Sequence, residues 1–330
     1  MERIKQPNNE WKLVSLFAGI GGIDLGFEFA GFNCIWANDF DKFACQTYRA
    51  NVGDQIIEGD IRLVKDQIPP HDILVGGFPC QPFSTLGKLQ GFDDEQNRGT
   101  LFFEIMSIIT THDTKVVVLE NVKNLINHDG GRTFNRIKKE LNDAGYDVNA
   151  TVLNTQDFGI PQRRNRVFIV AFNRRYFHTG EFVYPQKETL NITTQDLLDE
   201  NVPESYFLTT KVSKTILGKG TKGYIVNPTI DLPISKTLTA TMHKMHRASQ
   251  DNYVTDIINY QRNVTDKEKR ISIRKLTPNE CRKLQGFPSD WVQVVSDCQA
   301  YKQFGNAVTV DVAYKVALKI IEYIDANRKL

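Results

Sequence analysis

The sequence predicts an α/β protein with a doubly wound, mostly parallel sheet and a second, smaller domain that is irregular and β-rich. From about Trp11 to Phe172, short apolar runs alternate with amphipathic helical patterns, which is the order expected of a sheet flanked by helices. Beyond about Tyr184 the chain is rich in Thr, Lys, Asn and Gly, and it lacks long apolar periodicity until about Ile273. This change of texture indicates a separate domain of short strands and loops.

The expected strands of the first domain are short apolar runs. Two of them, Val116–Leu119 and Val167–Val170, are continuously apolar, as is typical of strands buried on both faces. The seven runs are Lys12–Phe17, Cys34–Ala37, Ile56–Glu58, Ile73–Val75, Val116–Leu119, Asp147–Leu153 and Val167–Phe172. Helical patterns lie between them at Ile23–Ala30, Lys42–Arg49, Leu101–Thr110 and Thr133–Ala144.

Regular patterning returns at Arg274. Thr277 precedes Pro278, and Glu280 follows three residues after the threonine, which predicts a helix that begins with a capping box. The last helix carries an apolar stripe that needs a large partner surface, and we expect the sheet of the first domain to provide it. We therefore expect one domain from residues 1–185 plus 274–330, and a second from residues 186–273. The stripe consists of Val308, Val312, Val316, Ile320 and Ile324.

Composition excludes several classes of protein. The formal net charge of the 330-residue chain is +2, so any contact with nucleic acid must come from local basic clusters. The 5 cysteines are odd in number and form no C-x-x-C pair, which argues against a disulfide framework and favours a reducing cytoplasm. His243 and His246 lack a third ligand nearby, so we expect no metal. We also expect no signal peptide and no membrane span.

Cys80 is the leading candidate for a reactive side chain. It lies between Pro79 and Pro82, directly after the apolar run Ile73–Val75. The prolines fix φ near −65° and stiffen the backbone around the sulfur. A free cysteine is more often a buried packing residue, but a stiffly held cysteine at the end of a strand favours a functional interpretation if other chemistry meets it at the same edge.

Three segments at strand ends predict a site for an adenosine-containing cofactor. Glycines at the first strand-to-helix turn let a ligand approach a helix N-terminus, and an acid about 20 residues later can bind a ribose diol. Because the third spaced glycine of the dinucleotide fingerprint is missing, the pattern favours a cofactor without a pyrophosphate, such as S-adenosylmethionine. An ordinary tight turn is the alternative for the glycines alone. The candidate residues are Phe17, Gly19, Gly21, Asp39, Phe40, Asp60 and Ile61.

Further polar residues occur at the ends of other strands. Glu120 directly follows an expected strand, so it should face the same crevice as Cys80, and a thiolate beside a carboxylic acid can carry out covalent catalysis. Arg164 and Arg166 alternate and would point to one side of an extended chain, where one guanidinium could reach a base or a phosphate. A solvated basic turn is the alternative. Asn306, after Gly305, suits a turn into the last helix.

The smaller domain contains a local basic cluster. Lys244 and Arg247 accompany the two histidines of the segment Met242–Arg247. This cluster is consistent with a surface that contacts nucleic acid, and a solvated polar loop explains it about as well.

Five of these segments together resemble, in order and spacing, the signature motifs of the C5-cytosine DNA methyltransferases. The likeness covers about Leu13 to Phe172 and Arg274 to the C-terminus, and the intervening part matches the variable target-recognition region only in position. The segments are Phe17–Gly22, Phe78–Gln81, Glu120–Val122, Gln162–Arg166 and Gln303–Asn306.

The resemblance implies the S-adenosylmethionine-dependent methyltransferase fold and a cytosine that is flipped out of double-stranded DNA. It implies that Cys80 attacks carbon 6, that Glu120 protonates or hydrogen-bonds N3, and that Arg166, with Arg164 close in sequence, holds the base. Asp39 is a departure, since the family often has Glu there. The implied cofactor contacts are Phe17, Asp39, Phe40, Asp60, Pro79, Leu101 and Asn306. The implied DNA contacts are Thr237 and, in the loop Gln81–Arg98 that resembles the family's mobile loop closing over the DNA, Gln81, Ser84 and Lys88. Lys244 and Arg247 of the basic cluster are the other DNA contacts that we expect.

The function implied is methylation of carbon 5 of cytosine in a specific DNA sequence by a monomer, in a bacterial restriction–modification system with a restriction endonuclease as functional partner. The same chemistry on tRNA is an alternative, although the long polar segment argues against it. An NAD-dependent oxidoreductase would leave Pro79-Cys80 and Gln162–Arg166 unexplained. A catalytically inactive homologue is disfavoured because the expected catalytic residue types are present, and an amino-methyltransferase because the Pro-Pro-Tyr type of motif is absent.

Overall fold

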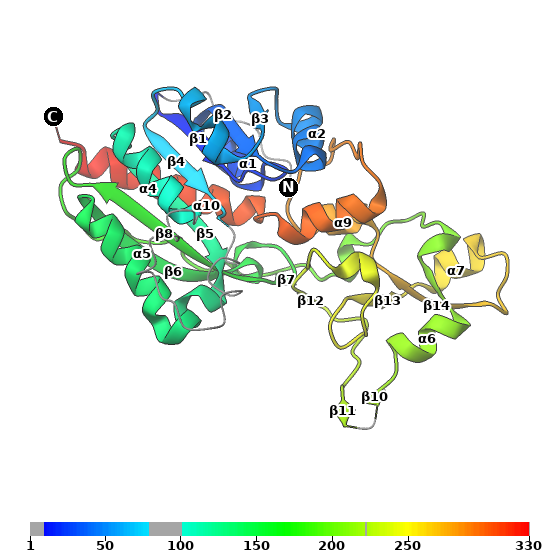
Figure 1. Cartoon of the computed structure of the whole chain (residues 1–330). Coiled ribbons are helices and arrows are strands. Elements are labelled where there is room, and N and C mark those ends of the chain that lie inside the picture. The colour runs from blue at the N-terminus through cyan, green and yellow to red at the C-terminus, as the bar shows by residue number, and fades with distance from the viewer. Residues whose placement is uncertain (1–9, 79–100, 222, 330) are drawn as a thin grey trace. The chain divides into compact units, whose positions relative to one another are not determined.

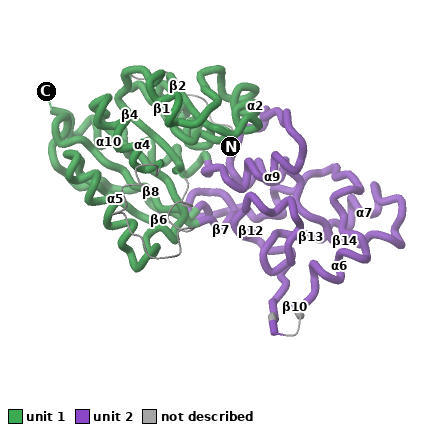
Figure 2. Tube along the Cα trace, viewed as in Figure 1, with its two compact units in different colours: residues 1–154, 165–186, 310–330 green, residues 155–164, 187–309 purple. Residues whose placement is uncertain are grey.

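The computed structural model describes residues 10–78, 101–221 and 223–329, and the chain forms two compact units (Figure 2). Unit 1 contains residues 1–154, 165–186 and 310–330, and unit 2 contains residues 155–164 and 187–309. The chain leaves unit 1 next to the expected boundary at residue 185. It returns at residue 310 rather than 274, and the short segment 155–164 also belongs to unit 2.

Unit 1 is built on a seven-stranded sheet with the order β3-β2-β1-β4-β5-β8-β6 (Figure 1). The first five strands of this order are parallel, and β8 is antiparallel to both of its neighbours. The predicted doubly wound, mostly parallel sheet is thus confirmed. Its strands are β1 (Lys12–Leu16), β2 (Asn33–Asp39), β3 (Ile56–Glu58), β4 (Ile73–Gly76), β5 (Val116–Val122), β6 (Tyr146–Asn154) and β8 (Asn165–Asn173).

Helices cover both faces of this sheet, which explains why its central strands are continuously apolar. On one face, Phe102 and Ile137 pack in a single buried cluster with Val14, Val117 and Ile169. The residues that alternate with these in each strand point to the other face. The helices of unit 1 are α1 (Gly22–Phe29), α2 (Lys42–Asn51), α3 (Ile61–Val64), α4 (Leu101–Thr111), α5 (Arg132–Asp143) and α10 (Val310–Asn327).

The last helix, α10, packs against α1 on that other face. At Gly26 the two backbones approach so closely that an added Cβ would lie 2.6 Å from the Cβ of Ala313. Tyr323 stacks on Phe172 of β8, with ring centroids 3.9 Å apart. The apolar stripe therefore lies against unit 1, as predicted, although the helix begins at Val310 rather than Val308. Across the described residues, no helix is both long and apolar enough to cross a membrane.

Unit 2 is made of short elements with small apolar clusters, as expected of the smaller domain. A three-stranded antiparallel sheet has the order β13-β14-β9, and β12 pairs in parallel with β7. Its strands are β7 (Gln162–Arg163), β9 (Phe207–Thr209), β10 (Gly220–Thr221), β11 (Tyr224–Ile225), β12 (Ser235–Lys236), β13 (Tyr253–Thr255) and β14 (Arg270–Lys275). Its α-helices are α6 (Thr210–Ile216), α7 (Ile257–Asn263), α8 (Pro278–Lys283) and α9 (Asp297–Asn306).

A buried charge cluster explains why the chain stays in unit 2 after Arg274. The Arg274 side chain, which is fully buried, donates to Asp256 Oδ2 at 2.7 Å and to both carboxylate oxygens of Glu280 at 2.7 and 2.9 Å. Glu280 also completes the capping box with Thr277, so that prediction is confirmed. Since this cluster ties α8 to β14 and α7, residues 274–309 belong with unit 2 rather than with unit 1.

Candidate active site

An ion pair between Glu120 and Arg166 lies where β5 ends and β8 begins, in the interior of the sheet of unit 1. In the antiparallel pairing of β5 with β8, Arg166 is opposite Val122 and Phe168 is opposite Glu120. Glu120 and Arg166 therefore share one face, and Arg166 Nε lies 3.0 Å from Glu120 Oε1. The two side chains are only 10% and 17% exposed. Burial lowers the pKa of Arg166, and the charge of Glu120 opposes that shift.

The end of β4 is held close to this ion pair. Asn121 is buried and donates its Nδ2 to the carbonyl oxygen of Phe78 at 2.7 Å. An added Cβ on Gly77 would lie 3.4 Å from Glu120 Oε2, so the backbone passes directly beside the carboxylate. The segment leading toward Cys80 is thereby fixed next to Glu120 as far as Phe78. Cys80 itself lies outside the described residues, as do Pro79, Gln81, Ser84 and Lys88.

The turn after β1 is shaped by residues with positive φ. Phe17, Gly19 and Gly21 have φ values of 54°, 58° and 86°. An added Cβ on Gly21 would lie 2.8 Å from a methyl group of Val52, so this position requires glycine. In contrast, an added Cβ on Gly19 would meet nothing within 4 Å. The turn is therefore tightly packed on its helix side and open at Gly19.

The end of β2 carries an acid that is bonded to this turn. Asp39 Oδ2 accepts the backbone N–H of Gly19 at 2.8 Å, and Oδ1 accepts that of Asp41 at 2.8 Å. Burial raises the pKa of Asp39, and these two hydrogen bonds lower it. The neighbouring residue, Phe40, is 79% exposed. Asp39, Phe40 and Gly19 thus form a cradle with one fixed carboxylate and one exposed aromatic face.

The third predicted cofactor segment follows β3. Asn38 Nδ2 donates to the carbonyl oxygens of Ile57 and Gly59, each at 2.9 Å, and so joins this segment to β2. Asp60 caps α3, and its carboxylate is paired with Arg62, a residue that the sequence analysis did not single out. Ile61 is 2% exposed and packs in the core, so only its backbone remains available to a ligand.

The two arginines expected on one side of the chain have different partners. Arg164 lies between β7 and β8 and is only 1% exposed. It donates to the carbonyl oxygens of Leu238, Gly305 and Ala307 at 2.9, 3.1 and 2.7 Å, all within unit 2. The alternation rule does not apply because the strand is interrupted at this residue. Arg164 is a buried structural residue here, whereas Arg166 faces Glu120.

Other predicted residues lie in unit 2. Asn306 is exposed and is the last residue of α9, so the expected turn into the last helix is instead a helix end. Thr237 donates its hydroxyl to the carbonyl oxygen of Arg163 at 2.6 Å. Arg247 is held by the carbonyl oxygens of Thr215 and Gly218, whereas Lys244 is exposed. Within the described ranges, no three His, Cys, Asp or Glu side chains are grouped to hold a metal ion.

The residues that the sequence analysis missed are mainly those that hold the site together. Asn121 lies inside the motif Glu120–Val122, and Gly77 directly precedes the motif Phe78–Gln81. A side-chain amide directly after a catalytic candidate, and a glycine at a strand end, are signals that could have identified them. Nothing in the sequence distinguishes Arg62 from other surface arginines.

Comparisons with known proteins agree on one family. The model of the family described as C-5 cytosine-specific DNA methylase matches residues 11–322. The chain is 40% identical to the Type II methyltransferase M.SsoII of Shigella sonnei, over 97% of this chain and 83% of the relative. It is 40% identical to the Type II methyltransferase M.HpaII of Haemophilus parainfluenzae, over 96% of this chain and 91% of the relative.

Solved structures agree on the fold. The Dnmt2 methyltransferase of S. pombe matches with a TM-score of 0.74 and 20% identity, over 95% of this chain and 99% of that one. The Entamoeba histolytica methyltransferase EhMeth matches with a TM-score of 0.70 and 21% identity, over 97% and 99% of the two chains.

Proposed function

The chain belongs to the C-5 cytosine-specific DNA methylase family, and on that premise we propose how its residues bind the methyl donor and activate the cytosine. The enzyme methylates carbon 5 of cytosine in DNA. The observation that carries the proposal is the Glu120–Arg166 ion pair beside Gly77 and Phe78, because it supplies an oriented acid close to the chain segment that continues into Cys80.

We propose that S-adenosylmethionine is bound by the ends of β1, β2 and β3, where it supplies the methyl group as a carbon electrophile. The residues present fit this ligand. The Asp39 carboxylate is fixed by two backbone N–H groups and retains free lone pairs for a ribose diol. The Phe40 ring is exposed for stacking, and the space over Gly19 is open. Pro79, Leu101 and Asn306 remain proposed contacts from the family resemblance.

The chemical problem is that carbon 5 of cytosine is a weak nucleophile in an aromatic, electron-poor ring. In the proposed mechanism the Cys80 thiolate forms a bond to carbon 6, and the electron pair of the 5,6 double bond becomes available at carbon 5. After carbon 5 has been methylated, loss of its proton re-forms the double bond and breaks the bond between sulfur and carbon 6. Cys80 is therefore regenerated, and this is covalent catalysis.

Glu120 and Arg166 act on the ring during the addition. We propose that Glu120 holds a proton at N3, which withdraws electrons from the ring and favours attack at carbon 6. Arg166 orients the carboxylate through the 3.0 Å contact between Nε and Oε1 and donates its Nη1 to the carbonyl oxygen of Asn165. It offers its Nη2 group to the base. Since this site cannot reach a stacked base, the cytosine must leave the duplex, at a cost of a few kcal/mol.

The biological role proposed is that of the Type II relatives, namely protection of host DNA against a restriction endonuclease with the same recognition sequence. The recognition sequence around the target cytosine would be read by unit 2, with Thr237 and Lys244 among the DNA contacts. The protein would act on double-stranded DNA as a monomer, without a metal, in the cytoplasm.

Bisulfite sequencing of genomic DNA from a bacterial host that expresses the protein tests this proposal. The expected result is full cytosine-C5 methylation at one short sequence, which is lost with Cys80→Ala although the purified variant still binds that sequence. Labelled methyl groups should enter DNA and not RNA in parallel reactions. Transfer to RNA alone, or methylation that survives Cys80→Ala, would contradict the proposal.

A further inference from the structure

Arg164 joins two segments of unit 2 that the proposed function assigns to different ligands. Its Nη1 donates to the carbonyl oxygen of Leu238, and its Nη2 donates to those of Gly305 and Ala307. Leu238 follows Thr237, a proposed DNA contact. Gly305 and Ala307 are the two residues on either side of Asn306, a proposed cofactor contact. One guanidinium thus bridges the backbone at both proposed contacts.

The loop that carries Thr237, residues 237–241, is attached to the segment that carries Arg164. β12 pairs with β7 immediately before it. The Thr237 hydroxyl then donates to the carbonyl oxygen of Arg163 at 2.6 Å, and the Leu238 N–H donates to Gln162 Oε1 at 2.9 Å. The loop therefore moves only if these bonds, and the bond from Arg164, lengthen or break.

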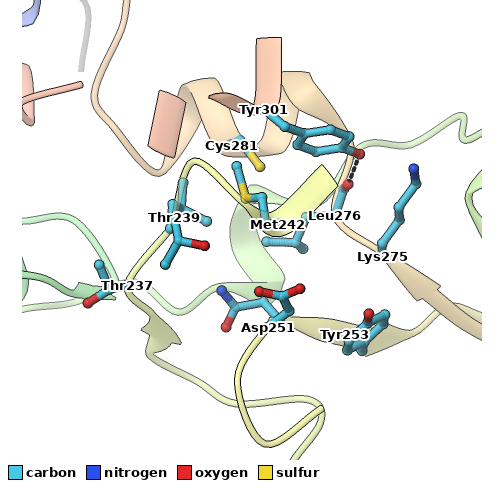
Figure 3. A pocket seen from close by; sticks show the side chains of 11 residues that line it. Thr237, Thr239, Met242, Asp251, Tyr253, Lys275, Leu276, Cys281 and Tyr301 are labelled. Carbon is cyan, nitrogen blue, oxygen red and sulfur yellow. Dashed lines mark hydrogen bonds between the residues drawn. The ribbon is translucent and has the colours of Figure 1, made fainter. Parts of the chain in front are cut away.

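The same loop touches the end of α9 directly. An added Cβ on Gly305 would lie 2.2 Å from the carbonyl carbon of Thr239, so the two backbones are in contact without an intervening side chain. Elsewhere the loop borders a pocket that Thr237 and Thr239 line together with Cys281 and Tyr301 (Figure 3). Leu238 is buried within the loop, and the loop is held by the hydrogen bonds described above and by its contact with α9.

The chemistry of the arginine suits a fixed connection. A guanidinium is planar, carries five donors in a rigid fork and stays charged in proteins. Hydrogen bonds from a charged donor are stronger than neutral ones. The three acceptors are backbone carbonyls, which do not titrate, so no change of protonation can release Arg164. A displacement of Leu238 is therefore transmitted to residues 305–307, and the reverse also holds.

We propose that Arg164 is a positioning residue that couples occupancy of the DNA contact at Thr237 to occupancy of the cofactor contact at Asn306. This inference rests on the proposed function. By linkage, DNA must then tighten cofactor binding by the same factor as cofactor tightens DNA binding. Coupling between two sites is commonly about 5- to 150-fold, and we expect a value in that range for the wild-type enzyme.

Calorimetric titration of the full-length protein with S-adenosylhomocysteine, with and without the duplex identified by bisulfite sequencing, measures this coupling. In Arg164→Lys the charge remains, but a single ammonium lacks the fork that reaches both segments. We expect the coupling factor to fall to about one-fifth of the wild-type value or less, with a larger rise in KM for both ligands than fall in kcat.

Arg282→Lys is the matched control. Arg282 is also buried in unit 2 and donates to the backbone carbonyls of Phe287 and Pro288, but with Asn279 its partners all lie within residues 279–288. It should lower thermal stability as Arg164→Lys does and leave the coupling factor within about twofold of wild type. Equal loss of coupling in both variants would show that the effect is general destabilisation and would overturn the proposal.

Hydrogen exchange on the wild-type enzyme gives a test without a variant. S-adenosylhomocysteine alone should slow exchange of the Leu238 and Met242 amides, which are bonded to Gln162 and Thr239. No change at these amides, or wild-type coupling below about twofold, overturns the inference while methyl transfer to DNA still supports the proposed function. Absence of transfer to any DNA would instead refute the proposed function.

Discussion

Arg164 and Arg166 are two residues apart, yet they lie in different compact units and have opposite surroundings. Arg166 in unit 1 faces a carboxylate at 3.0 Å, and 17% of its side chain is exposed. Arg164 in unit 2 is 1% exposed and faces three backbone carbonyls. A buried guanidinium is thus balanced by an opposite charge in one unit and by neutral dipoles in the other.

The two kinds of partner, a carboxylate for Arg166 and backbone carbonyls for Arg164, allow different roles. A carboxylate can share or transfer a proton, and its arginine can turn donors toward a substrate, so the Glu120–Arg166 pair can respond to a bound base. Backbone carbonyls neither titrate nor move independently of the chain, so Arg164 can only hold segments together. Reactivity and rigidity are therefore provided by the same residue type within one short motif.

The largest expected effect is on catalysis and comes from the charged partner in unit 1. Glu120→Gln removes the acid that Arg166 orients, so kcat for methyl transfer should fall by about 10²- to 10⁴-fold. Single-turnover transfer of a labelled methyl group measures it. The matched control is Asp72→Asn, which breaks the Asp72–Lys115 ion pair (2.6 Å) just before β4 and β5, at the opposite end of the same strands. A kcat that falls equally in both variants would contradict a catalytic role.

The next prediction compares the two arginines: replacing Arg164 should mainly reduce stability, and replacing Arg166 should mainly reduce activity. Arg164→Lys should lower the free energy of unfolding by about 2–4 kcal/mol, because at least one buried carbonyl loses its donor. Arg166→Lys should cost less than about 2 kcal/mol, because an ammonium can still pair with Glu120, but it should lower kcat more. Urea unfolding of both variants, together with their kcat values, checks this crossed pattern. Equal losses of stability would remove the distinction between the two surroundings.

The sequence predicted more of unit 1 than of unit 2, for a physical reason. Strands buried on both faces leave continuous apolar runs, and the seven expected runs coincide with the seven strands of the sheet. The capping box at Thr277 was equally visible because it is a local pattern. The structural role of Arg164 could not be predicted. Its acceptors, at Leu238 and at residues 305–307, are more than 70 residues away in the sequence, and they are backbone carbonyls, which do not depend on residue type.

The same limit applies to the site and to the domain boundary. Glu120 and Arg166 were each placed by the strands that precede or follow them, and their pairing follows from the register of β5 and β8. The domain boundary predicted at residue 274 did not take the Arg274–Glu280 cluster into account, because two opposite charges six residues apart in the sequence resemble an exposed helix face. Only the fold shows that both are buried.

A third buried charge extends the comparison to an anion held by neutral groups. Asp24 of α1 is fully buried and accepts the hydroxyls of Tyr48 at 2.8 Å and Ser15 at 2.9 Å. Its pKa is raised from 3.8 to about 6, chiefly by burial and also by the charge of Glu28, while the two hydrogen bonds oppose the rise. Arg164 stays charged in the folded protein. Asp24, whose negative charge is only partly stabilised by its hydrogen bonds, can instead become neutral by binding a proton.

The sign of the resulting pH dependence follows from linkage. Between about pH 4 and 6 the folded protein binds a proton at Asp24 that the unfolded chain has lost, so this group makes stability fall as pH rises through that window. The contribution is roughly 3 kcal/mol at most. Asp24→Asn should flatten this part of the stability profile, and Ser15→Ala should extend the fall to higher pH. An unchanged profile in urea unfolding of Asp24→Asn would contradict the assignment.

The smallest effect is expected at the exposed pair of Asp60 and Arg62, where solvent already compensates both charges. If Asp60 contacts the cofactor as proposed, Arg62 competes for its carboxylate, and the side-chain hydrogen bond from Arg62 lowers the pKa of Asp60. Arg62→Gln should then lower KM for S-adenosylmethionine by less than about fivefold, and Asp60→Asn should raise it. The matched control is Arg132→Gln, which breaks the exposed Asp129–Arg132 pair far along the chain and should leave KM unchanged. An increase in KM with Arg62→Gln would contradict this prediction and would mean that the arginine itself attracts the cofactor. The exposed Asp60–Arg62 pair would then contribute to cofactor binding, as the buried Glu120–Arg166 pair contributes to catalysis.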